Sequence, residues 1–343
     1  MRLVQTLVVR DEVDIIDAQI AYHLNAGVDF VIATDHDSED GTTEILESYE
    51  RRGYLQLTRE RGEVRESDWR TRMARAAATE HKADWVINTD ADEFWVPRDG
   101  TLKDVLAAVP DAAGVVWATT CHFVPRPDDG GAFAERMTAR VAGEAALNDP
   151  TSPYRPHAKA VHRSDPSIQV RFGSHRVVSE ILKPLPAWHP ADVFHFPFRS
   201  LEQYERKTVR RARGDKPLGQ YVKGLQAREQ GRMESVYRYL MIDDEALARG
   251  LASGSLVHDR RLRDALRQLR LKDGRFSLPA EDAAALVSGP DDGGTRARFA
   301  LDEAALRDSD VVRLVRRLDE LRTRVDEVSS RRWARAGRRS ERA

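Results

Sequence analysis

Short apolar runs alternate with amphipathic stretches through the first third of the sequence, and this alternation constrains the fold more than any other feature. The apolar runs are Leu3 to Val9, Phe30 to Thr34, Trp85 to Thr89 and Gly114 to Thr120, with Tyr54 to Leu57 a shorter fifth. The amphipathic stretches between them are Asp14 to Ala26, Thr42 to Arg52 and Ser67 to His81. This β, α, β, α order predicts an α/β fold built on a mainly parallel sheet flanked by crossover helices.

The rest of the chain has a different pattern. From about Asp128 to Trp188 proline, glycine and aspartate interrupt short β-like pieces, at Ser167 to Phe172 and His175 to Val178, as in the loops of a binding domain. Beyond Ser200 only helical patterns are legible, with no further strand. We therefore expect an α/β domain over residues 1–200, a helical region over 201–310, and an amphipathic helix with a basic tail over 311–343.

The last amphipathic helix has the spacing of a short coiled coil. Its apolar positions are Val311, Leu314, Leu318, Leu321, Val325 and Val328. Such a helix could join two copies in a homodimer, or it could pack on its own domain. The tail after it, Ser329 to Ala343, carries six arginines against one glutamate, which is typical of a disordered tail or of a contact with phosphate or a membrane surface.

The charge balance and the cysteine count exclude several classes of protein. Lys plus Arg number 55 against 56 Asp plus Glu, so no global field favours nucleic acid as a partner. Cys121 is the single cysteine, which rules out an intramolecular disulfide and a multi-cysteine zinc site and fits a reducing compartment. The first apolar run is too short for a signal peptide or a transmembrane segment. We expect a cytoplasmic protein, with peripheral contact at the inner face of the membrane left open.

The strongest chemical signal is the segment ADWVINTDADEFW, an apolar run that ends in acidic residues. Ligands of parallel α/β sheets bind at the carboxyl ends of the strands. Asp90 and Asp92 are two residues apart, so in an extended chain both can face one hard cation. Such a cation bridges two phosphate oxygens and offsets the charge on a departing diphosphate. A second Asp-x-Asp, at Asp35 and Asp37, also follows a predicted strand, although capping a turn is the alternative for each of these aspartates.

These residues carry a resemblance to a known family. The opening VVRDEVDIIDAQIAYHLNAGVDFVIATDHDSEDGTTEIL, followed by NTDADEF, resembles family 2 type glycosyltransferases with the GT-A fold, in a bacterial branch. Asp11 departs from the asparagine that is commoner at this position. The resemblance covers roughly residues 1 to 125, and sparser matches follow in HAKAVHR, GSHRV and HFPFRSLEQYERK. It implies metal-dependent transfer of a sugar from a nucleotide-diphosphate sugar to the hydroxyl of a glycan or small-molecule acceptor.

The resemblance also implies roles for individual residues. Donor binding falls to Arg10, Glu12, Asp35, Asp37, Ser38 and Asp90. The metal, Mn²⁺ or Mg²⁺, falls to Asp90, Asp92 and His195, since a later histidine completes the site in several such enzymes. Arg199 and Lys207 follow His195 closely and could supply the cations that a diphosphate needs; a solvated helix face is the alternative for both.

Most family 2 enzymes invert the anomeric carbon, which requires a base for the acceptor hydroxyl. The candidates are His175 and Glu180, with Asp192 third. The richness in arginine and alanine suggests a bacterium of high G+C content, where polysaccharide or another glycoconjugate would be the product.

The positions of the aspartates and glycines in the sequence argue against other functions. A haloacid dehalogenase type hydrolase carries its Asp-x-Asp after the first strand, but here Asp11 is followed two positions later by Val13. A sugar nucleotidyltransferase or a dinucleotide-binding dehydrogenase opens with a glycine-rich loop, and Arg10 to Asp17 contains no glycine. A non-catalytic carbohydrate-binding or scaffolding protein of the same fold stays open as the second alternative.

Overall fold

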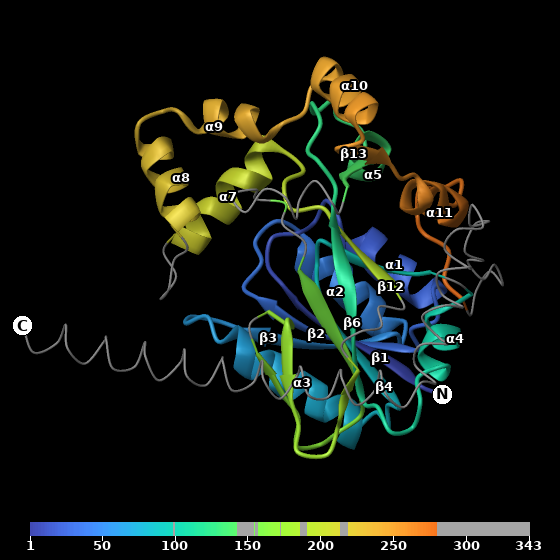
Figure 1. Cartoon of the computed structure of the whole chain (residues 1–343). Helices are drawn as coiled ribbons and strands as arrows, with labels where there is room; N and C mark the ends of the chain where they lie inside the picture. The colour runs from blue at the N-terminus through green and yellow to red at the C-terminus, as the bar shows by residue number, and fades with distance from the viewer. Residues whose placement is uncertain are drawn as a thin grey trace, which may run out of the picture.

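The computed structural model describes residues 1–98, 100–142, 154, 157–171, 173–185, 191–212 and 219–279. One nine-stranded sheet forms its centre, in the order β3-β2-β1-β4-β8-β6-β12-β5, with β11 paired to β6 (Figure 1). Two small antiparallel pairs, β9 with β10 and β7 with β13, lie outside it. The predicted α/β fold, a mainly parallel sheet with flanking helices, is confirmed.

The N-terminal half of the sheet is parallel throughout. Its strands are β1 (Leu3–Val9), β2 (Phe30–His36), β3 (Leu55–Glu60) and β4 (Trp85–Asp90). The helices that connect them are α1 (Ile16–Asn25), α2 (Thr42–Arg51) and α3 (Glu66–Thr79). In the register of β1, Val9 lies beside Asp35 and Val8 beside Asp90. The carboxyl ends of three strands therefore meet at one edge.

The other half of the sheet is mixed. Its strands are β5 (Glu93–Pro97), β6 (Val115–His122), β8 (Ala158–Arg163), β11 (Pro184–Leu185) and β12 (Ala191–His195). β8 runs antiparallel between β4 and β6, whereas β12 is parallel to β6 and antiparallel to β5. Because β5 begins right after Asp92, the chain reverses at the acidic segment instead of continuing into a helix. This places His195 beside Glu93 and His122.

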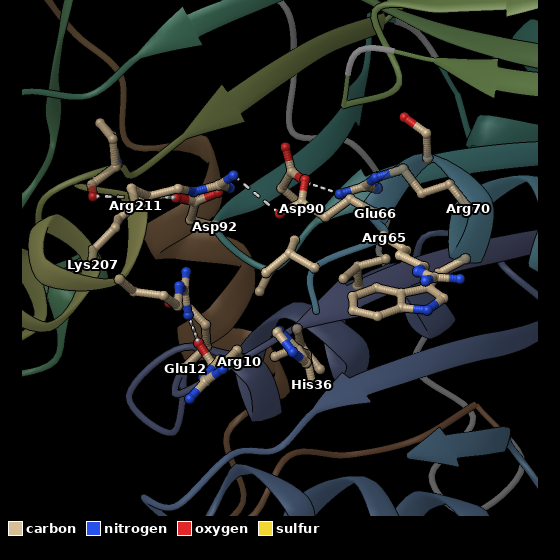
Figure 2. Close-up of a pocket in the computed structure, with 18 of the residues that line it drawn as sticks. Arg10, Glu12, His36, Arg65, Glu66, Arg70, Asp90, Asp92, Lys207 and Arg211 are labelled. Atoms are coloured by element: carbon tan, nitrogen blue, oxygen red, sulfur yellow. Dashed lines mark hydrogen bonds and ion pairs between the residues drawn. The ribbon is translucent and has the colours of Figure 1, made fainter. Parts of the chain in front are cut away.

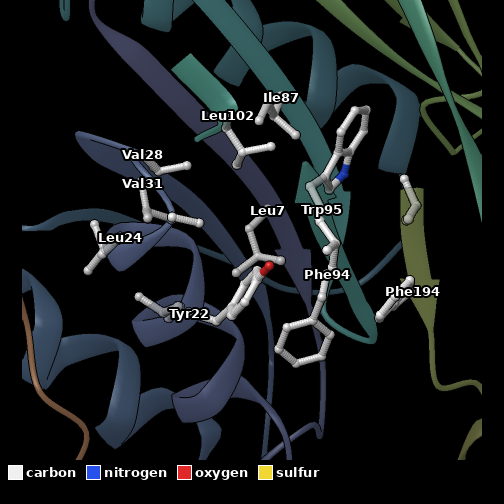
Figure 3. Packing of buried hydrophobic residues seen from close by; sticks show 14 of the residues in the cluster. Leu7, Tyr22, Leu24, Val28, Val31, Ile87, Phe94, Trp95, Leu102 and Phe194 are labelled. Atoms are coloured by element: carbon white, nitrogen blue, oxygen red, sulfur yellow. The ribbon is translucent and has the colours of Figure 1, made fainter. Parts of the chain in front are cut away.

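Apolar side chains on the two faces of the sheet form two core layers. On one face Leu3 and Leu7 of β1 pack with helices α1, α2, α4 (Leu102–Ala107) and α11 (Arg261–Leu269). Figure 3 shows this layer, with Tyr22 and Leu24 of α1 near Leu7, Val31 and Phe94. On the opposite face Val4 packs with Met73 of α3 and with Val170 of β9 (Gln169–Arg171). The period-2 alternation along β1 thus supplies both layers.

The helical part after residue 200 begins with α7 (Leu201–Ala212), α8 (Gly219–Glu229), α9 (Met233–Leu240) and α10 (Asp244–Ser253). These helices lie beyond the carboxyl edge of the sheet in Figure 1, whereas α11 returns to pack on α1. Leu262, Leu266 and Leu269 of α11 belong to the main core. Helix α11, in the described part of the region predicted as 201–310, therefore shares a hydrophobic core with the α/β domain. Among the described residues, no helix is both long and apolar enough to cross a bilayer.

Two expectations about the later chain were wrong. A strand does occur beyond Ser200: β13 (Leu256–His258) pairs with β7 (Ala139–Val141), and its three residues are too few to show a strand period. The interval read as irregular contributes β8 to the centre of the sheet, whereas its two predicted β-like pieces are confirmed as β9 and β10 (Arg176–Val178). The remaining short helix of this interval is α5 (Phe133–Arg136). The predicted coiled-coil helix and basic tail lie outside the described residues.

Candidate active site

A cleft of about 860 Å³ opens at the carboxyl ends of β1, β2 and β4. Its floor includes Asp90 and Asp92, one wall is the first turn of α3 with the loop before it, and the other is α7 (Figure 2). Among the described residues, the Lys and Arg side chains that line it are Arg10, Arg65, Arg70, Lys207, Arg210 and Arg211. Both acidic and cationic groups line the cleft, so it can bind a ligand that carries phosphate and still offer carboxylates to a cation.

Asp90 is held from two sides by buried cations. Its Oδ1 accepts a hydrogen bond from the Arg70 guanidinium, and its Oδ2 lies 2.7 Å from Nζ of Lys159. Lys159 also bonds Oε1 of Glu93 at 2.9 Å and the carbonyl of Gly173 at 2.7 Å, so its three N–H groups all have acceptors. Burial raises the pKa of Asp90, but Lys159 and Arg70 outweigh it and hold the pKa below its ordinary value. Asp90 is therefore ionised at neutral pH.

Asp92 faces a second set of groups. Its Oδ2 lies 2.7 Å from Nζ of Lys207, which comes from α7, and 3.4 Å from Nε2 of His195 at the end of β12. Burial opposes the charge on Asp92, yet Lys207 and His195 lower its pKa well below the ordinary value. The same pairing raises the pKa of Lys207 despite its burial, through Asp92 and then Glu12. A lysine ammonium thus neutralises each aspartate of the pair.

His195 is paired with another histidine that sequence analysis did not single out. The Nδ1 atoms of His195 and His122 are 2.9 Å apart, because β6 and β12 place the two residues opposite each other. Both rings line the cleft, and so does that of His157. Three imidazoles therefore lie on the side of the cleft formed by β6 and β12.

The loop after β1 is tied to the loop after β2. The N–H of Asp11 donates to Oγ of Ser38 at 3.0 Å, and the N–H of Glu39 donates to Oδ1 of Asp11 at 2.9 Å. Asp11 and Asp37 both adopt left-handed backbone, with φ of 54° and 55°. Aspartate and asparagine tolerate this conformation better than most residues, so an aspartate fits the backbone at both positions.

The lining of the cleft does not include three residues that were predicted to bind the donor nucleoside, namely Asp35, Asp37 and Ser38. Asp35 is buried and accepts hydrogen bonds from Ser38 Oγ at 2.6 Å and Thr43 Oγ1 at 2.5 Å, which fixes the turn into α2. Asp37 pairs with the exposed Arg61 at 3.3 Å. The structure therefore gives this Asp-x-Asp the turn-forming role. Of the other predicted donor residues, Arg10, Glu12, Asp90 and Lys207 do line the cleft.

Arg199 was also expected to face the donor, but its guanidinium lies behind the cleft. It is 1% exposed, and it binds Glu12, the carboxylate of Asp14 at 2.6 and 2.9 Å, and the carbonyl of Phe196 at 3.0 Å. These contacts join the loop after β1 to the entry of α7. Arg199 is not among the residues that line the cleft.

Neither predicted catalytic base lines the cleft. His175 bonds the carbonyl of Ala158 through Nδ1 at 2.8 Å, and burial together with Lys159 lowers its pKa to about 4. Glu180 is exposed and follows Ser179, whose hydroxyl binds Asp165 near the start of β4. Glu180 is therefore at the edge of the sheet opposite Asp90. Asp192, the third candidate, pairs with Arg98 at 3.1 Å and Arg261 at 3.3 Å.

The predicted metal ligands fit a cation only in part. Among the described residues there is no group of three or more His, Cys, Asp or Glu side chains that could hold a metal ion. Asp92 and His195 nevertheless converge, with Oδ2 and Nε2 3.4 Å apart. A divalent cation shared with a diphosphate needs only one or two protein ligands, because phosphate oxygens and water complete its shell. Asp92 has one oxygen, Oδ2, bonded to Lys207, whereas Asp90 has both oxygens bonded to cations, so of the two aspartates Asp92 is the one that fits such a site together with His195.

The sequence contains a signal for the two cations that bind Asp90, which are Arg70 and Lys159. Arg70 lies on the buried face of α3, in step with Met73, Ala74 and Ala77. Lys159 lies inside the apolar strand β8, between Ala158 and Ala160. A charged residue on an otherwise apolar face needs a buried partner, so each position indicates an ion pair. The sequence could not identify Asp90 as the partner, because the pairing depends on strand order.

Comparisons with known proteins bear on the N-terminal part. Residues 4–116, less than half of the chain, match the model of glycosyltransferase family 92. This segment runs from β1 to the start of β6 and includes both Asp90 and Asp92. The match supports a glycosyltransferase, as the sequence implied, and it does not show the family 2 branch in particular. No curated protein matches the chain.

Several solved structures show distant similarity. S. aureus TarS 1–349 in complex with UDP-GlcNAc is 14% identical, with 68% of this chain and 73% of that chain covered and a TM-score of 0.34. TarS 1–349 in complex with UDP is 14% identical, with 84% and 99% covered and a TM-score of 0.33. Glucosyl-3-phosphoglycerate synthase from Mycobacterium tuberculosis, in complex with Mn²⁺, UDP and phosphoglyceric acid, is 15% identical, with 48% and 56% covered and a TM-score of 0.26.

Proposed function

We propose that the protein is a glycosyltransferase that moves a sugar from a nucleoside diphosphate donor to an acceptor hydroxyl. The observation that carries this proposal is the acidic pair Asp90 and Asp92 at the end of β4, facing a cleft whose walls are cationic. The family 92 match covers the same strand and the same pair. The carboxyl edge of a parallel sheet is also where such folds bind their ligands.

The cations of the cleft suit a diphosphate. Lys207 and Arg211 come from α7, while Arg65 and Arg70 come from the opposite wall, so a ligand between them meets positive charge on both sides (Figure 2). Arg211 pairs with Glu66 at 3.0 Å, which holds the two walls together. Charge-assisted hydrogen bonds from such groups are stronger than neutral ones and would anchor the phosphates.

Each aspartate has a separate role in this proposal. Asp90, fixed by Arg70 and Lys159, stays ionised and orients the donor within the cleft. Asp92, with His195, would hold a Mn²⁺ or Mg²⁺ ion, which would supply positive charge against the charge of the leaving diphosphate. Lys207 keeps Asp92 ionised and is close enough to share the diphosphate with it. Protein cations thus balance the negative charges of Asp90 and Asp92 before the donor binds.

The finer features of the reaction follow the related enzymes. We propose inversion at the anomeric carbon, as in family 2 type enzymes, and a glycan or small-molecule acceptor in polysaccharide or glycoconjugate synthesis. The acceptor would enter beside α7 and α8, where Phe198 and Tyr221 line the cleft. Because His175 and Glu180 lie outside the lining, we assign no catalytic base.

Substitution of Asp92 tests this proposal. Asp92→Asn removes a carboxylate without changing the size of the side chain, so we expect loss of metal-dependent donor hydrolysis in a protein that keeps its fold. Asp37→Asn is the matched control, because this aspartate belongs to the other Asp-x-Asp and pairs only with exposed Arg61 in the described structure. Near wild-type hydrolysis by Asp92→Asn would remove the assigned role. A folded wild-type protein that hydrolyses no nucleotide sugar would favour the non-catalytic alternative.

A further inference from the structure

Arg210 of α7 lines the cleft and has no role in the function proposed so far. Its Nη1 donates a hydrogen bond to the carbonyl of Arg10, directly after β1, at 2.9 Å. Among the described residues, no carboxylate forms an ion pair with its guanidinium. A guanidinium carries five N–H donors, so most of the donors of Arg210 remain open to the cleft.

The other lysine and arginine side chains in the described lining of the cleft each have a carboxylate partner. The pairs are Lys207 with Asp92 at 2.7 Å, Arg211 with Glu66 at 3.0 Å, Arg65 with Glu63 at 2.9 Å, Arg10 with Asp11 at 3.5 Å, and Arg70 with Asp90. A phosphate that binds one of these cations has to share the cation with a carboxylate or displace the carboxylate. A phosphate that binds Arg210 meets no such competition.

The surroundings of Arg210 leave its positive charge poorly compensated. Burial, and then the charge of Arg211, lower the pKa of Arg210 below its ordinary value, although Glu12 and Asp11 act in the opposite direction. A partly buried charge is costly unless an opposite charge accompanies it. An anionic group bound in the cleft would supply that opposite charge, so the site favours a ligand with phosphate at this position.

We propose that Arg210 binds a phosphate oxygen of the donor and supplies the metal-independent part of its affinity for the diphosphate. The proposal rests on the function proposed above, which places the donor in this cleft. Arg210 follows Lys207 by three residues, so the two are neighbours on the surface of α7. Its contact with Arg10 places it at the carboxyl end of β1, the edge where parallel sheets bind their ligands. From there a guanidinium can donate two parallel hydrogen bonds to one phosphate.

Two substitutions separate the charge of Arg210 from its hydrogen bond to Arg10. Arg210→Lys keeps the charge, whereas Arg210→Gln keeps a donor without the charge. Isothermal titration calorimetry on the full chain, without metal, gives the affinities for UDP, GDP, ADP, CDP and dTDP. For the diphosphate that binds wild type most tightly, we expect Arg210→Gln to weaken binding about 10- to 100-fold. Arg210→Lys should show a smaller loss, because an ammonium keeps the charge but not the paired donors.

The matched control is Arg206→Gln, on the same helix but outside the lining of the cleft, and it should bind as wild type does. The melting temperature without ligand should be equal in the four proteins. Binding of the corresponding nucleoside, followed by saturation-transfer difference NMR, should also be equal. The affinity of Arg210→Gln for the diphosphate should fall less steeply with NaCl concentration than that of wild type, because one screened charge is missing.

Equal affinity for the diphosphate in wild type and Arg210→Gln would overturn the inference and leave the proposed function intact. Equal losses in Arg210→Lys and Arg210→Gln, or a parallel loss of nucleoside binding, would overturn it by showing that Arg210 only holds the loop after β1. Wild-type protein that binds the diphosphate only with Mn²⁺ would overturn the metal-independent role. Folded wild-type protein that binds no nucleoside diphosphate, with or without Mn²⁺, would overturn the proposed function as well.

Discussion

The ammonium of Lys207 lies 2.7 Å from Oδ2 of Asp92 and connects α7 to the end of β4. The same ammonium is 3.3 Å from the carbonyl of Pro197, at the entry to that helix. A helix from the C-terminal part of the chain therefore completes the site that the N-terminal strands begin. This contact also supplies a fixed positive charge where the diphosphate is proposed to bind.

Lys207→Met should weaken binding of UDP about 10- to 100-fold, because a hydrogen bond to a charged group contributes roughly 1.5–3 kcal/mol. Isothermal titration calorimetry with UDP measures this directly. Lys223→Met on the exposed surface of α8 is the matched control and should bind as wild type does. Equal affinities in wild type and Lys207→Met would show that this ammonium does not contact the phosphates.

Arg199→Met should lower the free energy of unfolding by about 3–5 kcal/mol, because it leaves Glu12 and Asp14 without their buried partner. Urea denaturation measures the change. Arg206→Met provides the comparison: Arg206 is partly exposed, its contact with Asp40 is 3.9 Å long, and its loss should cost less than about 1 kcal/mol. Similar decreases in the free energy of unfolding of the two variants would contradict the stabilising role given to the contacts of Arg199 with Glu12 and Asp14.

The stability of the fold should fall as the pH decreases from about 6.5 toward 4, in part through His23. Its Nδ1 donates to the carbonyl of Gln19 at 2.8 Å and its Nε2 accepts from the N–H of Trp95 at 3.0 Å, so the ring is neutral. Burial lowers the pKa of His23 to about 4. In this window the unfolded chain binds a proton that the folded chain excludes, so protonation favours unfolding by up to about 1.4 kcal/mol per pH unit.

Urea denaturation of wild type and His23→Gln at several pH values checks this sign. The variant has no group that titrates at this position. The slope of its unfolding free energy against pH should therefore correspond to about one bound proton fewer than in wild type. The readout is the slope and not the absolute stability, because the substitution also changes packing in the core. Parallel slopes would contradict a neutral, buried His23.

Local patterns were enough to predict the N-terminal half of the fold. β1 was predicted with its observed ends, and α2 within one residue, because apolar period and glycine at the helix end are local signals. β8 could not be predicted as a central strand, because its position between β4 and β6 is set by pairing with residues far away in the sequence. Strand content can be inferred locally, but the order of strands in a sheet cannot.

The candidate site also combines residues that local sequence patterns identify with residues that only strand pairing brings together. Asp90 and Asp92 were found because a strand end is a local feature, and both line the cleft. Asp35 gives an equally strong local pattern, yet its carboxylate is used by Ser38 and Thr43 in a turn. His122 carries no local signal, since only the register of β6 and β12 brings it to His195. Chemistry that depends on such pairings has to be read from the structure.

The central claim is that the cleft binds a nucleoside diphosphate together with a divalent cation. Thermal unfolding of the full chain with a series of nucleoside diphosphates and nucleotide sugars, each with and without Mn²⁺, tests it most directly, because a ligand of the folded state raises the melting temperature. We predict a rise with one nucleobase that is larger in the presence of Mn²⁺ and is lost in Asp92→Asn. No rise with any nucleotide, in protein shown to be folded, would contradict the claim.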